Sequence, residues 1–258
     1  MSDEPGHYAA KQLFGKSQLI NWSHRGRFMT GVSIADAMIG PESQILDYGC
    51  GDGTFIEFIF DRMGLEAGPR LAVGAELSED LVTDCESRRG GNEQIRYVLI
   101  EALKESSWKE TFDVLFCMEV FEHVVDRGKI LSELERLVKP GGHLVISVPV
   151  EIGPSLLVKQ TMRTVAGWRG VGDYPGIAPY TWGELMKGLF ADELQHIKRP
   201  VHGEDSLTPF HCHKGFNWRT FRSELEERFL LEKQLFSPVG LFGSLLASQV
   251  WFVLKKRP

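Results

Sequence analysis

The chain of 258 residues has few cysteines, no excess of positive charge and no long run of apolar residues. Its four cysteines show no C-x-x-C spacing, so the pattern predicts reduced thiols and excludes both a disulfide framework and a cysteine zinc cage. The 29 basic residues are outnumbered by 35 acidic ones, which gives a net charge of −6. This balance disfavours a protein dedicated to binding nucleic-acid duplexes.

The most apolar stretch, residues 239–254, is interrupted by glycine, serine and glutamine. It falls short of the roughly 18 uninterrupted apolar residues of a membrane-spanning helix. The first residues are polar and acidic, without the basic start and apolar stretch of a signal peptide. We therefore expect a cytoplasmic protein with no membrane partner. Its 43% hydrophobic residues are enough for one sizeable core.

Short apolar runs alternate with helical patterns over residues 43–149, which predicts a parallel sheet with right-handed crossovers. The predicted strands cover residues 44–48, 70–75, 94–100, 112–117 and 143–148. One helix follows the first strand, a second begins after the N-cap residue Ser78, and a third spans about residues 126–138. This third helix is expected to stop in a Lys-Pro-Gly-Gly turn at residues 139–142.

The alternation breaks over residues 150–215, where prolines, glycines and aromatic residues are concentrated. Helix-like pieces near residues 155–167 and 181–191 predict a partly helical cap, because structureless loops of this length are uncommon in compact domains. The aromatic residues fit either a lid over a partly apolar ligand or a small accessory core. Alternation then resumes with a helix near 217–228 and strands near 230–237 and 249–254.

A glycine-rich turn follows the first predicted strand, with glycines at positions 49, 51 and 53. Glycine lets the backbone turn tightly and approach a ligand closely. Thr54 stands where a dinucleotide fingerprint has its third glycine, and the lysine of a P-loop is absent. Asp47, two residues before the first glycine, suits a cationic ammonium better than a pyrophosphate. Glu76, at the end of the second strand, can accept both hydroxyls of a ribose. The alternative is a tight turn without a ligand.

These motifs resemble those of the class I S-adenosylmethionine-dependent methyltransferases over most of residues 43–150 and more loosely over 217–256. ILDYGCGDGTF is similar to the family's first motif and LAVGAEL to its acidic second motif. FDVLFCMEVFEHV and LVKPGGHLVISVP are similar to the segments around strands four and five. The resemblance implies an α/β Rossmann-like sheet of seven strands in the order 3-2-1-4-5-7-6. Strand seven would be antiparallel, and a helical cap would be inserted after strand five.

The resemblance also implies that S-adenosyl-L-methionine is the cofactor. Asp47 and Gly49 would then hold its methionine moiety and Glu76 its ribose. IEALK places Glu101 and Ala102 beside the adenine, although the family usually has Asp in place of this Glu. The backbone of Cys117 would line the floor of the cofactor site. Arg25 or Arg27 would pair with the cofactor's carboxylate. The alternative is that these arginines form a solvated basic face. The predicted cofactor site comprises Arg27, Asp47, Gly49, Gly51, Gly53, Glu76, Leu77, Glu101, Ala102 and Cys117.

This interpretation divides the chain into four parts. Residues 1–40 form an N-terminal helical segment that closes the cofactor site, and residues 41–150 form the cofactor-binding core. Residues 151–215 form the cap that binds the acceptor, and residues 216–258 complete the sheet.

A second group of polar residues surrounds the fourth strand's end. Glu119, Glu122 and His123 follow that strand, and His211 and His213 precede a later helix. Carboxylates and imidazoles from one sheet edge can hold a divalent cation such as Mg²⁺ or Mn²⁺. The pattern resembles the metal site of small-RNA 3′-end 2′-O-methyltransferases and, in part, ubiquinone-pathway O-methyltransferases. That resemblance implies Glu119, Glu122, His123 and His213 as ligands, with His211 the alternative fourth. Without metal, these residues would cap the helix and orient the acceptor.

The predicted function is methyl transfer from S-adenosylmethionine to an oxygen or nitrogen of a small, partly apolar metabolite. His123 or His213 would be the base, unless a cation activates the acceptor. Two alternatives stay open: a metal-dependent 2′-O-methyltransferase of RNA 3′ ends, and a cofactor-binding scaffold without catalysis. The composition disfavours the RNA alternative, and the sequence does not indicate an oligomeric state.

Overall fold

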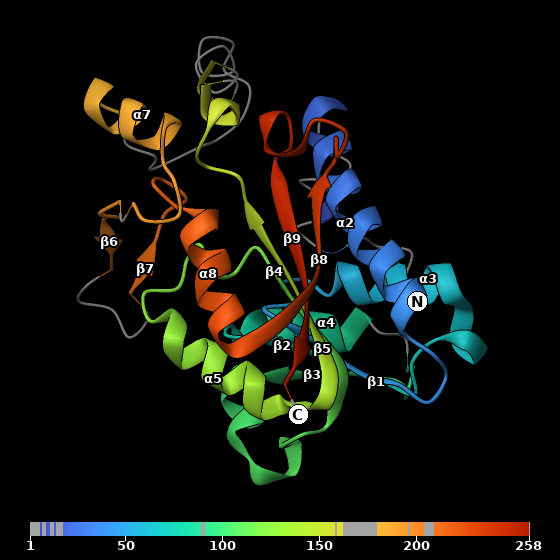
Figure 1. Ribbon diagram of the computed structural model, residues 1–258. Helices are drawn as coiled ribbons and strands as arrows, with labels where there is room; N and C mark the ends of the chain where they lie inside the picture. Colours follow the sequence, from blue (N-terminus) through green and yellow to red (C-terminus); the bar gives the residue numbers. More distant parts are fainter. Residues whose placement is uncertain are drawn as a thin grey trace. The chain divides into compact units, whose positions relative to one another are not determined.

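The computed structural model describes residues 18–88, 91–157, 159–161, 180–195, 197–203 and 209–257, together with residues 6, 9, 10 and 13 (Figure 1). Its main sheet contains β1 (Gln44–Tyr48), β2 (Leu71–Glu76), β3 (Ile95–Leu99), β4 (Phe112–Met118), β5 (Val138–Pro149), β8 (Phe229–Ser237) and β9 (Gln249–Lys256). The helices are α2 (Gln18–Met38), α3 (Thr54–Ala67), α4 (Glu79–Arg88), α5 (Arg127–Leu137), α7 (Trp182–Leu189) and α8 (Trp218–Arg228).

The seven strands are ordered β3-β2-β1-β4-β5-β9-β8. With β8 and β9 counted as strands six and seven, this confirms the predicted order. β9 is antiparallel to β5, as contacts at the two ends of β9 show. Lys256, at the end of β9, donates to the carbonyl of Val138 at the start of β5. The carbonyl of Ser248, just before β9, accepts from the amide of Val150, just after β5. The predicted antiparallel seventh strand is therefore confirmed.

The described chain divides into two compact units. Unit 1 comprises Met1–Met118, Gly128–Ile146 and Val253–Pro258, and unit 2 comprises Glu119–Arg127 and Ser147–Phe252. Among the described residues, no helix combines the length and the apolar character needed to cross a membrane.

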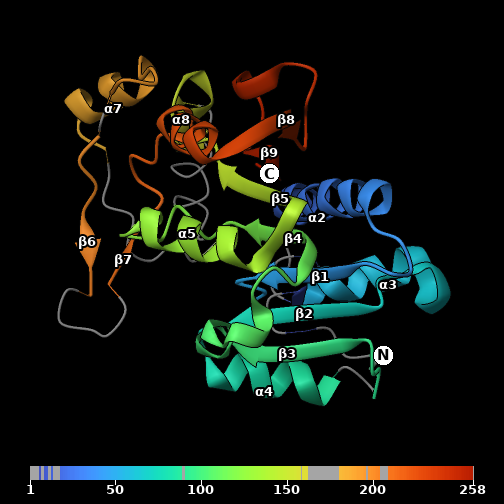
Figure 2. The ribbon, with the colours of Figure 1, turned by 60° about the horizontal axis from the view of Figure 1, so that its bottom comes forward.

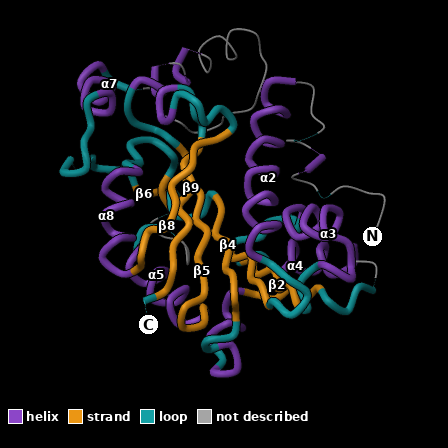
Figure 3. Tube along the Cα trace, turned by 45° about the vertical axis from the view of Figure 1, so that its right-hand side comes forward, coloured by secondary structure: helices purple, strands orange, loops and turns teal. Residues whose placement is uncertain are grey.

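The core of unit 1 is built on parallel strands. β1 pairs with β2 and β4, and β2 pairs with β3, while α4 runs alongside β3 (Figure 2). Phe55 on α3 packs edge-on against Phe116 on β4 with ring centroids 4.9 Å apart. Phe28 on α2 contacts the rings of Phe55 and Phe58, so α2 packs on α3 (Figure 3). These apolar contacts hold α3, which begins directly after the glycine turn, against β4 and α2.

Unit 2 has a core of aromatic side chains around α8. Phe221 on this helix contacts Phe121, Phe216 and Phe252, and all four rings are fully buried. Two short strands, β6 (Val201–His202) and β7 (Phe210–His211), form a separate antiparallel pair (Figure 1). The sequence indicated only helical pieces here, and the pair was missed because two-residue strands carry no periodic pattern.

The elements otherwise lie close to their predicted bounds, with one exception in β5. The expected turn at residues 139–142 belongs to this strand, which begins directly after α5. Lys139 binds the Asp113 carboxylate at 2.7 Å, which explains how the extended segment is held next to β4. In the cap, α7 confirms the predicted helix near 181–191. Residues 154–157 and 159–161 are helical, and the rest of the predicted helix to residue 167 lies outside the described residues.

Candidate functional site

The glycine turn of unit 1 is anchored to the end of β2. The amides of Gly49 and Cys50 both donate to the carbonyl of Ala75, at 2.8 and 3.1 Å. Gly49, Gly51 and Gly53 have φ values of 77°, 57° and 76°, which explains why glycine is required at these positions. A Cβ placed on Gly51 would meet no atom within 4 Å. The turn therefore has open space on the Gly51 side, where a ligand can approach the backbone.

Asp47, two residues before Gly49, is a buried carboxylate. It is 2% exposed, and both of its carboxylate oxygens lack a hydrogen-bond partner among the described residues. Burial raises the pKa of Asp47 to about 8, and the nearby Glu76 and Asp52 carboxylates add to this shift. A buried carboxylate without a partner is costly, so this group is suited to binding a cation.

Asp52, in the same turn, is fully occupied by contacts within the chain. One of its oxygens accepts the hydroxyl of Thr54 at 2.6 Å and the Thr54 amide at 3.3 Å. The other accepts the amide of Ala9 at 2.9 Å. Asp52 thus organises the start of α3 and binds the Ala9 amide, which leaves Asp47 as the carboxylate of this segment that is available to a ligand.

The carboxylate of Glu76 lies against the turn and accepts two backbone hydrogen bonds. The amide of Gly51 donates to one oxygen at 2.9 Å, and the amide of Leu77 donates to the other at 2.7 Å. Each carboxylate oxygen can accept a further hydrogen bond. Leu77 itself is 65% exposed. The structure therefore places Gly51, Glu76 and Leu77, three residues of the predicted site, next to one another.

The remaining residues of the predicted cofactor site differ in burial. On α2, Arg27 is buried with its guanidinium over the ring of Phe28, whereas Arg25 is exposed. Of the two predicted partners for a cofactor carboxylate, the structure thus encloses Arg27. Glu101 lies in the short helix Ile100–Lys104, where it is exposed and pairs with Lys104 at 2.6 Å. Ala102 lies in the same helix, and Cys117 is fully buried in β4.

Sequence reasoning missed two residues near these elements. The ring of Tyr97 on β3 occupies the space where a Cβ on Gly53 or Gly74 would lie, so both glycines are required for close packing as well as for backbone freedom. His24 lies one helical turn before Arg27, and burial together with the Arg27 charge lowers the pKa of His24 to about 4. Neither residue belongs to a motif, and only their tertiary contacts reveal them.

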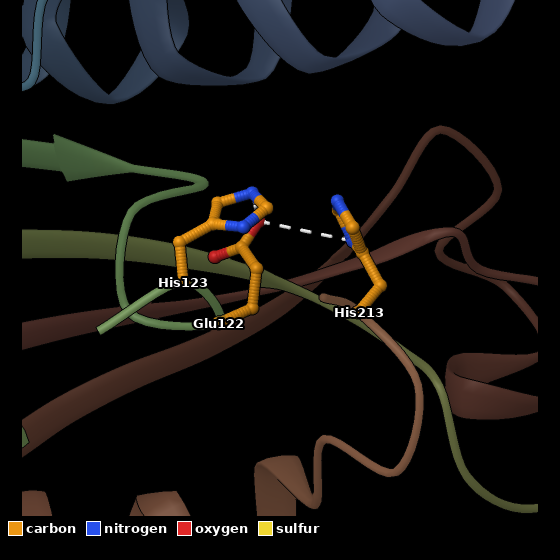
Figure 4. A group of neighbouring side chains, drawn as sticks. All are labelled: Glu122, His123 and His213. Atoms are coloured by element: carbon orange, nitrogen blue, oxygen red, sulfur yellow. Dashed lines mark ion pairs between the residues drawn. The ribbon is translucent and has the colours of Figure 1, made fainter. Parts of the chain in front are cut away.

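Unit 2 contains a compact group formed by Glu122, His123 and His213 (Figure 4). One donor atom from each residue lies within 4.8 Å of the others. The Glu122 carboxylate is fully buried, with Nε2 of His123 at 3.8 Å and Nδ1 of His213 at 4.0 Å. The two imidazole rings meet edge to face with centroids 4.8 Å apart. We call these three residues the histidine cluster.

The orientation of His123 is fixed by the backbone. Its Nδ1 lies 2.9 Å from the carbonyl of His211. A carbonyl can only accept, so this nitrogen carries the proton and Nε2 of the neutral ring has the free lone pair. Histidine ligands of metals commonly donate one ring N–H to a backbone carbonyl and bind the metal through the other nitrogen.

Glu119 and His211 lie outside the histidine cluster. The Glu119 carboxylate accepts the hydroxyl of Ser147 at 3.4 Å, and its backbone has a positive φ of 55°. The ring of His211 donates from Nδ1 to the carbonyl of Pro200 at 2.8 Å, and burial lowers the pKa of His211. The structure therefore brings together three of the four predicted metal ligands, and His213 rather than His211 lies beside Glu122 and His123.

The cap carries aromatic side chains with different environments. Trp182 and Phe190 on and next to α7 are 79% and 69% exposed, so neither packs in an accessory core. Tyr180 lies under the Lys214 ammonium at 5.1 Å, and its hydroxyl accepts the Gly215 amide. Trp168 and Tyr174 lie outside the described residues. A small cavity beside Tyr180 has a mixed lining, with charged residues such as Glu151 and Lys214 next to apolar ones such as Ile197.

Comparisons with known proteins identify similar chains and a shared fold. Residues 46–146 match a family described as "Methyltransferase domain". A ubiquinone biosynthesis O-methyltransferase from Pseudomonas fluorescens is 35% identical over 108 residues, which cover 40% of this chain and 43% of the relative. The match thus spans less than half the length of that curated relative.

Two solved structures share the fold over much greater lengths. A protein from Pyrococcus horikoshii OT3 has a TM-score of 0.60 at 16% identity, covering 98% of this chain and 100% of that chain. An S-adenosylmethionine-dependent methyltransferase from Mesorhizobium loti has a TM-score of 0.54 at 16% identity, covering 88% and 96%. Residues 46–146 of this chain are therefore similar to a methyltransferase domain, and the chain shares the α/β Rossmann-like fold of these solved structures.

Proposed function

We propose that this protein transfers the methyl group of S-adenosylmethionine to an oxygen or nitrogen of a small, partly apolar acceptor. The observation that carries the proposal is the buried Asp47 carboxylate, which lacks a hydrogen-bond partner among the described residues and directly precedes the glycine turn with its open space at Gly51. The methyltransferase match over residues 46–146 supports the same cofactor. The O-methyltransferase names of the curated relatives favour oxygen as the atom that accepts the methyl group.

The residues of unit 1 suit the cofactor in charge and in hydrogen-bonding capacity. Asp47 would bind the ammonium of its methionine moiety, and Arg27 would bind its carboxylate. Glu76 would accept the ribose hydroxyls while it keeps the Gly51 amide in place. When bound, S-adenosylmethionine supplies an electrophilic methyl group on a sulfonium. The chain has to align this group with the acceptor and exclude water, and no covalent intermediate with the protein is needed.

In unit 2, the histidine cluster would prepare the acceptor. Its two imidazole nitrogens and one carboxylate fit a divalent cation, and this donor set favours a transition metal such as Mn²⁺ over Mg²⁺. A bound cation would lower the pKa of an acceptor hydroxyl. Without a cation, His213 would take the proton itself, because the Glu122 carboxylate 4.0 Å from its Nδ1 stabilises the protonated ring. The cap, residues 151–215, would bind the rest of the acceptor.

The cofactor part of the proposal is tested by isothermal titration with S-adenosylhomocysteine. We expect saturable binding that is lost in Asp47→Ala and in Gly51→Val, because the first removes the counter-charge and the second places a branched side chain at a positive φ. Asp61→Asn is the matched control, since Asp61 is an exposed carboxylate on α3. Unchanged affinity in Asp47→Ala would overturn the proposal.

Transfer itself is tested with a labelled methyl group and fractionated cell extract. Saturable cofactor binding without transfer to any fraction would favour the scaffold alternative. The histidine cluster is also compatible with 2′-O-methylation of RNA 3′ ends, and this alternative predicts labelling of short RNAs that needs Mn²⁺ and a free 2′-hydroxyl. Labelling of RNA that survives EDTA would exclude that alternative.

A further inference from the structure

A single guanidinium, that of Arg199, binds the backbone on both sides of the histidine cluster. Its Nη2 donates to the carbonyl of Glu122 and to the carbonyl of Cys212, the latter at 2.6 Å. Its Nε donates to the carbonyl of Lys214 at 3.4 Å. Glu122 directly precedes His123 in the chain, and Cys212 and Lys214 flank His213. One side chain therefore fastens both segments that carry the imidazoles.

The surroundings of Arg199 keep its guanidinium in place and charged at neutral pH. Its guanidinium lies 5.1 Å from the centre of the fully buried Phe216 ring, which supports it from one side. Burial lowers the pKa of Arg199 to about 10, so the group still carries its charge and all its donor hydrogens near pH 7. A planar guanidinium can serve several acceptors in fixed directions, which an ammonium cannot do.

The two segments also hold each other directly. The amide of His211 donates to the carbonyl of His123 at 2.9 Å, and the His123 ring donates back to the carbonyl of His211. An isolated bridge pairs the next residues, Val124 and Phe210. These contacts set the distance between the segments. Arg199 in addition binds the carbonyls of residues 122, 212 and 214, directly beside the two imidazoles.

We propose that Arg199 is a positioning residue of the histidine cluster. By holding three carbonyls at once, it keeps the imidazoles of His123 and His213 aimed at the Glu122 carboxylate. The inference rests on the proposed function, in which this cluster binds a cation or takes the acceptor's proton. It extends that function to a residue that touches neither the cation nor the acceptor.

Cobalt titration of the full chain tests the effect on the cluster, because Co²⁺ bound to imidazoles is followed by its visible absorption. We expect Arg199→Ala to lower the Co²⁺ affinity by about 10- to 100-fold, as for other residues that orient metal ligands. Arg199→Lys should fall between Arg199→Ala and the wild type. S-Adenosylhomocysteine affinity should stay unchanged in both variants.

Arg127→Lys is the matched control. Arg127 also lies over the Phe216 ring, at 6.0 Å, but its guanidinium binds the Glu224 carboxylate at 2.9 and 2.5 Å. Its replacement should lower stability without changing the Co²⁺ affinity. An equal loss of affinity in Arg127→Lys and Arg199→Lys would mean that general loosening of unit 2 explains the effect, and would overturn the proposal.

Nitrogen NMR of the histidine rings in the cation-free protein provides a readout that does not depend on a metal. The wild type should show His123 as the Nδ1–H tautomer, and Arg199→Lys, with an unchanged circular dichroism spectrum, should show a mixture of tautomers. Unchanged His123 and His213 signals in this folded variant would overturn the proposal. If the wild type bound no Co²⁺ while these signals changed in the variant, the cation would be excluded and the positioning role would stand.

Discussion

The carboxylate of Glu76 accepts the amide hydrogen of Gly51 at 2.9 Å, across 25 residues of sequence. This contact ties the glycine turn to the end of β2 before any ligand is bound. Glu76 therefore has two tasks, because the residue that would bind the ribose also shapes the turn that would receive the cofactor.

Replacement of Glu76 should affect the protein with and without ligand. In Glu76→Ala, the Gly51 amide loses its acceptor, and we expect faster hydrogen exchange at this amide in the free protein. S-Adenosylhomocysteine affinity should fall by about 10- to 100-fold, since hydrogen bonds to a charged group are lost. Glu79→Ala, an exposed acid of the first turn of α4, is the control. Unaltered exchange at Gly51 in Glu76→Ala would contradict this account.

Asp47 should lower the stability of the free protein as the pH rises. Its folded-state pKa of about 8 lies above the value of about 3.9 in an unfolded chain, so the native state retains a proton that the unfolded state releases between these limits. The contribution of Asp47 to the free energy of unfolding is therefore largest below about pH 4 and is lost as the pH rises to about 8. Asp47→Asn stays neutral, so it should melt at a higher temperature than the wild type.

The melting difference between Asp47→Asn and the wild type should grow from pH 5 to pH 8 and then stay level. Each kcal/mol recovered corresponds to about 2–4 °C. Cofactor binding should become weaker in the same variant, which is the trade-off expected at a functional charge. Scanning calorimetry at several pH values measures the first effect and titration the second. A pH-independent melting difference would exclude the buried titration of Asp47.

Substitution of the two distal histidines distinguishes the alternative cation ligands. His213→Ala removes a member of the histidine cluster and should abolish Mn²⁺ or Co²⁺ binding. His211→Ala should bind the cation nearly as well as the wild type, because the His211 ring contacts the Pro200 carbonyl and its backbone contacts to His123 are kept. The reverse result would place His211 in the site and require a rearranged cap.

The stability of variants at position 119 should depend on the backbone conformation more than on the chemistry of the side chain. Its φ of 55° is unfavourable for every residue with a Cβ. We therefore expect Glu119→Gly to be more stable than Glu119→Ala by about 1 kcal/mol. Urea unfolding of both variants provides the comparison. Equal stability would show that residue 119 adopts another backbone conformation in solution.

The Tyr97 ring should make β2 intolerant of larger residues at position 74. An alanine Cβ there would lie 2.5 Å from the Tyr97 ring, and we expect Gly74→Ala to cost about 1–3 kcal/mol of unfolding free energy. Gly40→Ala is the control, since no atom lies within 4 Å of its Cβ position. Replacement of Tyr97 by Leu should restore part of the loss in the double variant. Independent effects of the two substitutions would contradict direct contact.

The order of the main sheet could be predicted because its strands carry strong local patterns. Ile45 and Leu46 are fully buried in β1, and the glycines that follow have the positive φ values that their spacing suggested. The contacts of Glu76 with the turn also follow from its place at the end of the neighbouring strand. In these segments, apolar burial and backbone freedom favour the same structure.

The sequence could not predict the contacts that only the tertiary fold creates. Glu119 and Glu122 have a spacing that suggested a shared site, but the positive φ at Glu119 accompanies a separate contact with Ser147. Arg199 lies between Lys198 and Pro200 without any motif, and its partners come from two distant segments. Local sequence does not distinguish such an arginine from one on the surface.

The contacts of Arg199 also bear on natural variation among related chains. Because it binds backbone carbonyls, the side chains at positions 212 and 214 can be exchanged without loss of those bonds. The arginine has no such freedom, since its donors must reach three acceptors at once. Relatives that keep both histidines should therefore retain arginine at position 199, while the residues on either side of His213 vary. Relatives without the histidines should also lack the arginine.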